Sequence, residues 1–418
     1  MLRPWMLLAG LALAAGTAHA DVDGAADADA PTRLSGVLQW RGLPPIAWTI
    51  ETAEGPVLST RVTGRARVSA DGLSGEASVV VDAATGEVTW RDGTLRLDLG
   101  RWLPRFLDAA RLAPLPAGMI VGGELTASTT GSWSARGLEG RADLAVSATL
   151  QRATPPLRVE GLTLTVTLPN LRDPADSPLQ RASFSTTRVG DITATNADIR
   201  FRIRGFREAQ IEGAQVGLLG GQVSVEPFAL RVAPAGLEPL ATTVRLDQIA
   251  LGAVIGLLPE SVSAATGSVS GAVGVQWSRE QSLTIGSGSL TLSRGESSQM
   301  RLAPQPGFLT SQLPRRLTLL PAWLGPISGW FSPPNPAYAA VEAIELGRAP
   351  LVIESLEVMT HPEADTAGRT ARLQVRARPA NPGAVGEVSF EINLFGPLNQ
   401  VLKLGLDKRV RLPGTERP

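Results

Sequence analysis

The sequence has no cysteine, two histidines, one tyrosine and an aromatic fraction of only 5%. Without cysteine the chain can form no disulfide, thiolate nucleophile, iron–sulfur cluster or thiolate zinc site. Its 39 basic and 39 acidic residues cancel, so it lacks the positive field that drives non-specific binding to nucleic acids. We therefore expect neither thiol chemistry nor a nucleic-acid partner.

What is present begins with an export signal. Residues 1–20 contain Arg3, an apolar run from Trp5 to Ala15, and the small-residue pattern Ala18-His19-Ala20, which together are typical of a secretory signal peptide. The run is shorter than the roughly 20 apolar residues that span a bilayer. We expect cleavage before Asp21 and a periplasmic location, with an uncleaved membrane anchor as the alternative.

The next eleven residues, 21–31, carry four Asp among Ala and Gly without periodicity, which predicts a flexible acidic tether. After the tether, apolar residues alternate with polar ones, most clearly in Leu162-Thr-Leu-Thr-Val-Thr-Leu168. Such alternation predicts half-buried strands. The same period of two occurs in residues 88–99, 142–150, 199–203, 223–232, 269–277, 283–292, 373–377 and 388–394. We divide this β region into residues 32–206 and 207–418.

The predicted fold is mainly β: an elongated, curved antiparallel sheet whose apolar face forms a groove, with a few short helices. The alternative is a β-sandwich or barrel that closes this face on itself. Turns are expected at Asp71-Gly72, Asp92-Gly93 and Gly220-Gly221. The expected helices are residues 100–113, residues 251–258 and a terminal helix over residues 397–408.

No motif indicates catalysis. A P-loop, a nucleophile elbow, a zinc-binding His-Glu-x-x-His, a calcium loop and a dinucleotide fingerprint are all missing. Once the signal peptide is removed, His361 is the only histidine that remains, and its polar sequence neighbours favour a surface loop. We therefore nominate no catalytic residue and expect no enzyme, cofactor or metal.

One segment is unusually rich in tryptophan. Its candidate membrane-contact residues are of the types that settle at a bilayer interface: Arg315, Arg316, Trp323, Trp330 and Phe331. The alternative is an amphipathic element packed on the end of a sheet. The segment spans residues 308–331, and Pro314, Pro321 and Pro326 within it argue against one long helix.

The order of weak motifs in the second half is more telling. Residues 213–228 (GAQVGLLGGQVSVEPF) are followed by residues 243–251 (TVRLDQIAL), 265–273 (ATGSVSGAV) and 283–290 (LTIGSGSL). The tail adds Asn381-Pro382 and residues 391–395 (EINLF). Over roughly residues 207–410 this order resembles the C-terminal region of the YdbH-type branch of the AsmA-like, TamB-related proteins, a region also labelled "dicarboxylate transport domain".

The resemblance implies a β-groove protein of the bacterial cell envelope that shields phospholipid acyl chains and contributes to intermembrane lipid transport or outer-membrane maintenance. Its expected partner is phospholipid or another acyl lipid, with a membrane surface and envelope proteins as further candidates. Two alternatives stay open: an envelope assembly scaffold that pairs through strand edges, and a binder of small dicarboxylates.

The candidate groove residues are the apolar members of three alternating strands. They are Leu162, Leu164, Val166, Leu168, Ile199, Phe201, Ile203, Val388, Phe390, Ile392 and Leu394.

Overall fold

The computed structural model describes residues 33–39, 42–52, 61–82, 84–109, 114–190, 192–233, 236–255, 262–280, 282–295, 297–307, 309–317, 333–361, 368–381, 383 and 385–395. The expected signal peptide, tether and terminal helix lie outside these residues. The chain divides into two compact units. Unit 1 comprises Met1–Val216 with Pro227–Leu240, and unit 2 comprises Gly217–Glu226 with Ala241–Pro418.

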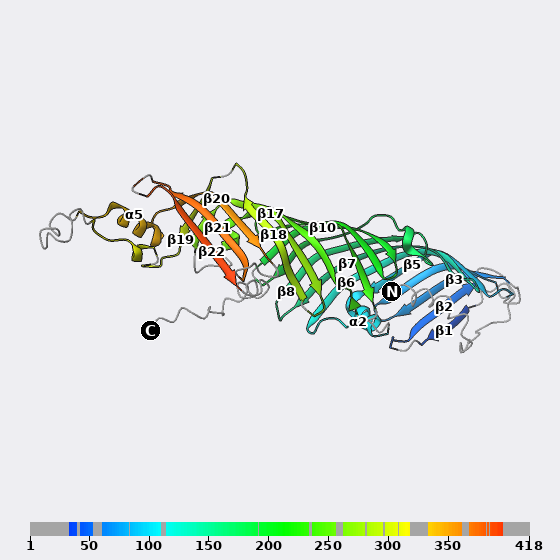
Figure 1. The fold of residues 1–418 in the computed structure, drawn as a ribbon. Helices are drawn as coiled ribbons and strands as arrows, with labels where there is room; N and C mark the ends of the chain where they lie inside the picture. Colours follow the sequence, from blue (N-terminus) through cyan, green and yellow to red (C-terminus); the bar gives the residue numbers. More distant parts are fainter. Residues whose placement is uncertain are drawn as a thin grey trace. The chain divides into compact units, whose positions relative to one another are not determined.

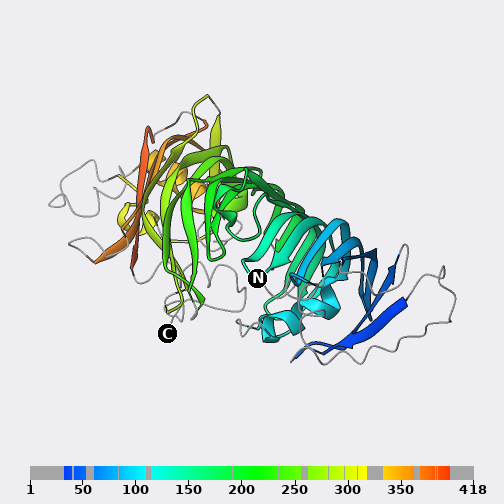
Figure 2. The same ribbon diagram turned by 90° about the vertical axis from the view of Figure 1, so that its right-hand side faces the viewer.

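Unit 1 is built on an antiparallel sheet in which β1 to β10 pair with one another in chain order (Figure 1). Its strands are β1 (Arg33–Leu38), β2 (Ile46–Thr52), β3 (Arg61–Ala70), β4 (Leu73–Asp82), β5 (Glu87–Asp98), β6 (Met119–Ser134), β7 (Gly137–Arg152), β8 (Leu157–Leu168), β9 (Gln180–Val189), β10 (Ile192–Gly205), β11 (Glu208–Leu218), β13 (Phe228–Ala233) and β14 (Gly236–Leu237). Helix α2 (Leu99–Ala109) follows β5, and the short 3₁₀ turn η1 (Pro174–Asp176) follows β8. Figure 2 shows α2 beside one end of these strands.

Unit 2 is also antiparallel. Its strands are β12 (Gly221–Val225), β15 (Leu240–Ala250), β16 (Val262–Thr266), β17 (Ser268–Ser278), β18 (Ser282–Leu292), β19 (Ser298–Leu302), β20 (Leu351–Thr360), β21 (Arg369–Pro379) and β22 (Val388–Phe395). Strand β20 pairs with β18, β19 and β21, and β21 pairs with β22. The helical elements are α3 (Leu251–Ile255), η2 (Thr310–Gln312) and α5 (Pro336–Glu345).

The prediction of a mainly β, antiparallel fold with a few short helices is confirmed, and the sheet is not closed into a barrel. The helix expected over residues 100–113 is present as α2 over residues 99–109, and residues 110–113 lie outside the described residues. The one expected over residues 251–258 is present as α3 over residues 251–255, and its last three residues lie outside the described residues.

Two local predictions were wrong, and one helix was missed. Asp92-Gly93 is not a turn but a bulge within β5, where β5 has one residue more than either neighbouring strand. The single strand expected over residues 223–232 is two strands, β12 and β13, because Pro227 between them has no N–H to donate. Helix α5 was not predicted, although Asn335 caps it and Pro336 begins it.

The core of unit 1 lies on one face of its sheet, in two bands that cross the strands. One band is centred on Trp48, Val79, Trp90, Ala142 and Leu168. The other band takes in the buried side chains of α2, and it consists of Ile46, Leu73, Leu97, Leu99, Trp102, Val121 and Ala148. The bands share one sheet face because the strands alternate apolar with polar residues.

Candidate functional site

The face of the unit 1 sheet that carries both core bands, here called the apolar face, is built from rows of paired residues. One row passes from β3 to β10 through residues that are direct cross-strand partners, namely Ala70, Leu73, Leu97, Leu125, Val146, Leu164, Ala182 and Ile199. Every member is aliphatic. Cross-strand partners on one face stand within contact distance of one another, so the row is a continuous apolar strip.

A second, parallel row runs from β2 to β8. Its paired members are Trp48, Val68, Gly75, Leu95, Ala127, Leu144 and Val166. Seven neighbouring strands thus contribute no polar side chain to this strip. In β8 the apolar face carries Leu164 and Val166, which are half-buried, while Thr163 and Thr165 on the opposite face are exposed.

The opposite face of the same strands is polar. Two paired rows there line a shallow groove of about 1050 Å³. Arg67 and Arg96 face this groove, but Arg67 pairs with Glu51 at 3.4 Å and Arg96 with Glu124 at 2.7 Å. The mixed charges leave no cluster of arginines among the groove residues that would favour an anion.

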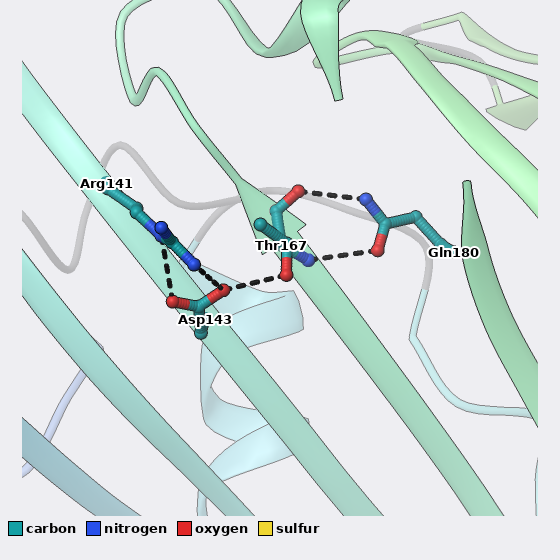
Figure 3. A network of polar contacts seen from close by, with 4 residues as sticks. All are labelled: Arg141, Asp143, Thr167 and Gln180. Atoms are coloured by element: carbon teal, nitrogen blue, oxygen red, sulfur yellow. Dashed lines mark hydrogen bonds and ion pairs between the residues drawn. The ribbon is translucent and has the colours of Figure 1, made fainter. Parts of the chain in front are cut away.

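A buried glutamine fixes the end of β8. The Gln180 side chain, 4% exposed, accepts from the Thr167 N–H at 3.0 Å and donates to the Thr167 carbonyl at 2.8 Å (Figure 3). The Thr167 hydroxyl donates to Asp143 at 2.7 Å, and Arg141 holds both oxygens of that carboxylate. The pKa of Asp143 is lowered mainly by the hydrogen bonds from Arg141 and, to a smaller extent, by the hydrogen bond from Thr167. This network aligns β8 with its neighbours and so holds Val166 on the apolar face.

Helix α2 covers one end of the apolar face. Trp102 is fully buried, its ring stacks on Phe106 with centroids 5.6 Å apart, and its indole N–H donates to the Asp71 carbonyl at 2.9 Å. Sequence reasoning placed these residues at helical spacing but did not connect them to the groove. The contact could have been predicted from one feature: α2 follows β5 without a loop, and this direct connection keeps the helix against the sheet.

The seven unit 1 candidates from the sequence are brought together by the structure. Leu164 joins Ile199 through Ala182 between them, and Val166 and Ile203 pack against the same core band. Leu168 is buried in that band, whereas Leu162 packs against the band that includes α2. Phe201 pairs with Gln180 and is half-buried.

The four remaining candidates lie on β22 in unit 2. Val388 pairs with buried Ala377, and Phe390 pairs with buried Val375. Ile392 and Leu394 pair with Leu373 and Ala371 through their backbones, and their side chains lie outside the described residues. On the other face of β22, the hydrogen bond from Arg372 lowers the pKa of Glu391 to about 2.

Of the membrane-contact candidates, Trp323, Trp330 and Phe331 lie outside the described residues. Arg315 and Arg316 are exposed, and the Arg315 guanidinium donates to the only tyrosine hydroxyl, that of Tyr338, at 3.0 Å. Backbone hydrogen bonds join Leu317 to Pro333 and Asn335 to Arg315. The chain therefore enters and leaves residues 318–332 at one place, beside two arginines.

A buried carboxylate fixes the neighbouring loop. Glu345, 2% exposed, accepts N–H groups of Gly307, Leu309 and Thr310 at 2.6, 2.7 and 2.8 Å. Burial would raise the pKa of Glu345, but these bonds outweigh it and lower the pKa. This site could not be predicted from the sequence, because it brings together residues more than 30 positions apart.

Within the described residues, no group of three or more His, Cys, Asp or Glu side chains has the arrangement of a metal site. The helices of that same part of the chain are all too short or too polar to cross a membrane.

The comparisons with known proteins give the geometry a family context. A family model described as "YdbH-like: Intermembrane phospholipid transport protein YdbH" matches residues 3–313. The match starts far upstream of the region where the motifs alone indicated a resemblance, and it ends before the tail. Neither a curated protein nor a solved structure matches the chain. Because the family model covers well over half of the 418 residues, this chain belongs to the YdbH-like family of intermembrane phospholipid transport proteins.

Proposed function

We propose that the chain works in the periplasm, where it binds phospholipid acyl chains on the apolar face and contributes to their movement between the inner and outer membranes. The observation that carries this proposal is the pair of uninterrupted apolar rows that both cross β3 to β8, of which Leu144, Val146, Leu164 and Val166 are half-buried. A soluble protein seldom leaves so extended an apolar strip open to water.

The mechanism is physical rather than chemical. Each methylene that moves from water onto the apolar face stabilises the complex by about 0.8 kcal/mol, so a few methylenes are enough to hold a chain. Neighbouring rows offer equivalent surroundings, with no polar side chain in either strip, and an acyl chain can shift along them without meeting a large barrier. A lipid transport family needs no catalytic group for this.

The first prediction concerns Val166, which lies on the apolar face next to Leu144. Val166→Asp places a carboxylate in the strip, where an acyl chain would bury it without a partner. We expect native mass spectrometry of the protein isolated from cells to show bound phospholipid for the wild type and a loss of at least about tenfold for the variant, a factor that corresponds to about 1.4 kcal/mol.

The matched control is Thr165→Asp, one residue away on the exposed polar face. It adds the same charge to the same strand and is expected to keep its lipid. Wild-type protein without lipid, or Val166→Asp protein with as much lipid as the control, would contradict the proposal.

The alternative of a dicarboxylate binder finds less support. Its recognition would require converging arginines without carboxylate partners. Arg67 and Arg96 on the polar groove already pair with Glu51 and Glu124, and Arg372 on β21 pairs with Glu391 on β22.

A further inference from the structure

The apolar face of unit 1 has two parts that differ in how far their side chains are covered. In β2, β4 and β5, most large side chains of this face are at most 9% exposed, although Leu95 of β5 is half-buried. The covered side chains include Ile46, Trp48, Ile50, Leu73, Trp90 and Leu97. In β6 to β10 the large side chains in the middle of the face are only half-buried, among them Leu125, Leu144, Val146, Leu164, Val166 and Ile199. Several buried positions in these later strands are alanines, such as Ala127, Ala142 and Ala197, and the buried large side chains Val121 and Leu168 lie near the ends of their strands.

Tryptophan rings account for the covered part. The ring of Trp48 lies over Gly36, where a Cβ atom would come within 2.7 Å of it, and the ring of Trp90 lies over Gly131 at the same distance. Neither glycine could carry a side chain without displacing the indole. The first strands therefore use glycine on a neighbouring strand to seat a ring flat against the sheet.

Hydrogen bonds also hold the indole rings of Trp90 and Trp102 in place. The Trp90 indole N–H donates to the Thr129 hydroxyl at 3.2 Å, and that of Trp102 donates to the Asp71 carbonyl. A buried indole whose N–H has found a partner loses that hydrogen bond if it swings out, so it keeps its position. This part of the face is filled by the protein's own aromatic side chains.

From this contrast we propose that the phospholipid-binding part of unit 1 begins at β6 and that Trp48, Trp90 and Trp102 close the apolar face on the side of the first strands. The inference rests on the proposed function and locates its site. An acyl chain lies against β6 to β10, where aliphatic side chains are half open, and stops where the rings already occupy the face. Lipid thus enters and leaves unit 1 along β6 to β10 and not along β2 to β5.

The absence of cysteine makes a direct test possible, because any introduced thiol is unique. Three near-isosteric replacements compare the two parts: Val79→Cys in the covered part, and Val146→Cys and Val166→Cys in the open part. Thr165→Cys on the polar face serves as the exposed control. Each full-length variant is treated with a water-soluble thiol reagent, after delipidation and again after loading from vesicles of phosphatidylethanolamine and phosphatidylglycerol.

We expect Val146→Cys and Val166→Cys to react when delipidated and to slow by about tenfold or more with phospholipid. We expect Val79→Cys to react at least about tenfold more slowly than either in both conditions, since a buried thiol reacts only through local opening. Thr165→Cys should react fast with or without lipid.

The outcomes separate the two claims. Protection of Val79→Cys equal to that of Val166→Cys would overturn the closed part while leaving the proposed function intact, and so would fast reaction of Val79→Cys without protection. Unreactive thiols at Val146 and Val166 would overturn the open part. Reactive thiols there that phospholipid does not protect would overturn the proposed function itself.

Discussion

At the scale of single residues, two buried polar side chains form hydrogen bonds with backbone groups that have no backbone partner among the described residues. The Gln180 amide forms with Thr167 the pair of bonds that a neighbouring strand would otherwise provide. The Glu345 carboxylate gathers three N–H groups of a loop that has no ladder of its own. Both satisfy backbone groups for which burial without a partner would be costly.

Removing the Gln180 amide leaves two backbone groups of Thr167 unpaired. We predict that Gln180→Leu lowers the stability of unit 1 by about 1–3 kcal/mol. It should also speed hydrogen exchange of the Thr167 amide, which loses its acceptor. Arg188→Leu, at an exposed position of the same strand, should leave that exchange rate unchanged, and equal rates in the two variants would show that the glutamine is dispensable.

The lowered pKa of Glu345 gives a pH dependence with a definite sign. Because its pKa falls below the ordinary value of 4.5 on folding, its stabilisation is complete above that value and disappears as the pH drops through the lower folded pKa. Glu345→Gln should therefore destabilise unit 2 by about 1–3 kcal/mol at neutral pH.

The difference between wild type and Glu345→Gln, measured by urea unfolding, should shrink below about pH 4.5. Glu342→Gln, on the same helix but only half-buried, provides the control. A difference between wild type and Glu345→Gln that stays constant down to pH 3 would refute this account of the carboxylate.

At the scale of elements, alternation alone predicted most strands. In β8 every apolar residue of the repeat from Leu162 to Leu168 lies on one face of the strand. The period of two therefore predicted one polar, exposed face and one apolar face. It could not predict the β5 bulge, which brings Trp90 and Leu95 to one face although they are an odd number of residues apart. Nor could alternation predict helix α5. Its apolar residues are spread around the helix, so they do not form the one-sided stripe by which a helix is recognised in a sequence.

The seating of Trp90 over Gly131 leads to a test at this scale. A Cβ at Gly131 would lie 2.4 Å from the Glu139 carbonyl oxygen and 2.7 Å from the Trp90 ring. We predict that Gly131→Ala lowers stability by about 1–3 kcal/mol through overpacking and changes the emission of the buried indole.

Gly205→Ala is the control, since that glycine has open space around its Cβ position. Equal unfolding midpoints for Gly131→Ala and Gly205→Ala would contradict the proposed packing of Trp90.

At the scale of the whole molecule, composition and fold agree. Some of the opposite charges that cancel in the sequence pair across neighbouring strands on the polar face, as Arg67 does with Glu51 and Arg181 with Asp198. Such exposed pairs contribute little to stability, but they keep that face hydrated and free of a net field. The candidate groove residues of unit 1 followed from the sequence because they alternate strictly. The tryptophans that close one part of the face did not, since closure depends on which neighbouring strands carry glycine.

The measurement that tests the central claim most directly is phospholipid transfer between donor and acceptor vesicles by the purified full-length chain. We expect the wild type to accelerate transfer, Leu164→Asp to reduce the rate nearly to that without protein, and Thr165→Asp, its neighbour on the polar face, to retain it. A buried charge on the apolar face should block acyl chains, while the same charge on the other face should not. Transfer by Leu164→Asp at the wild-type rate would contradict the account.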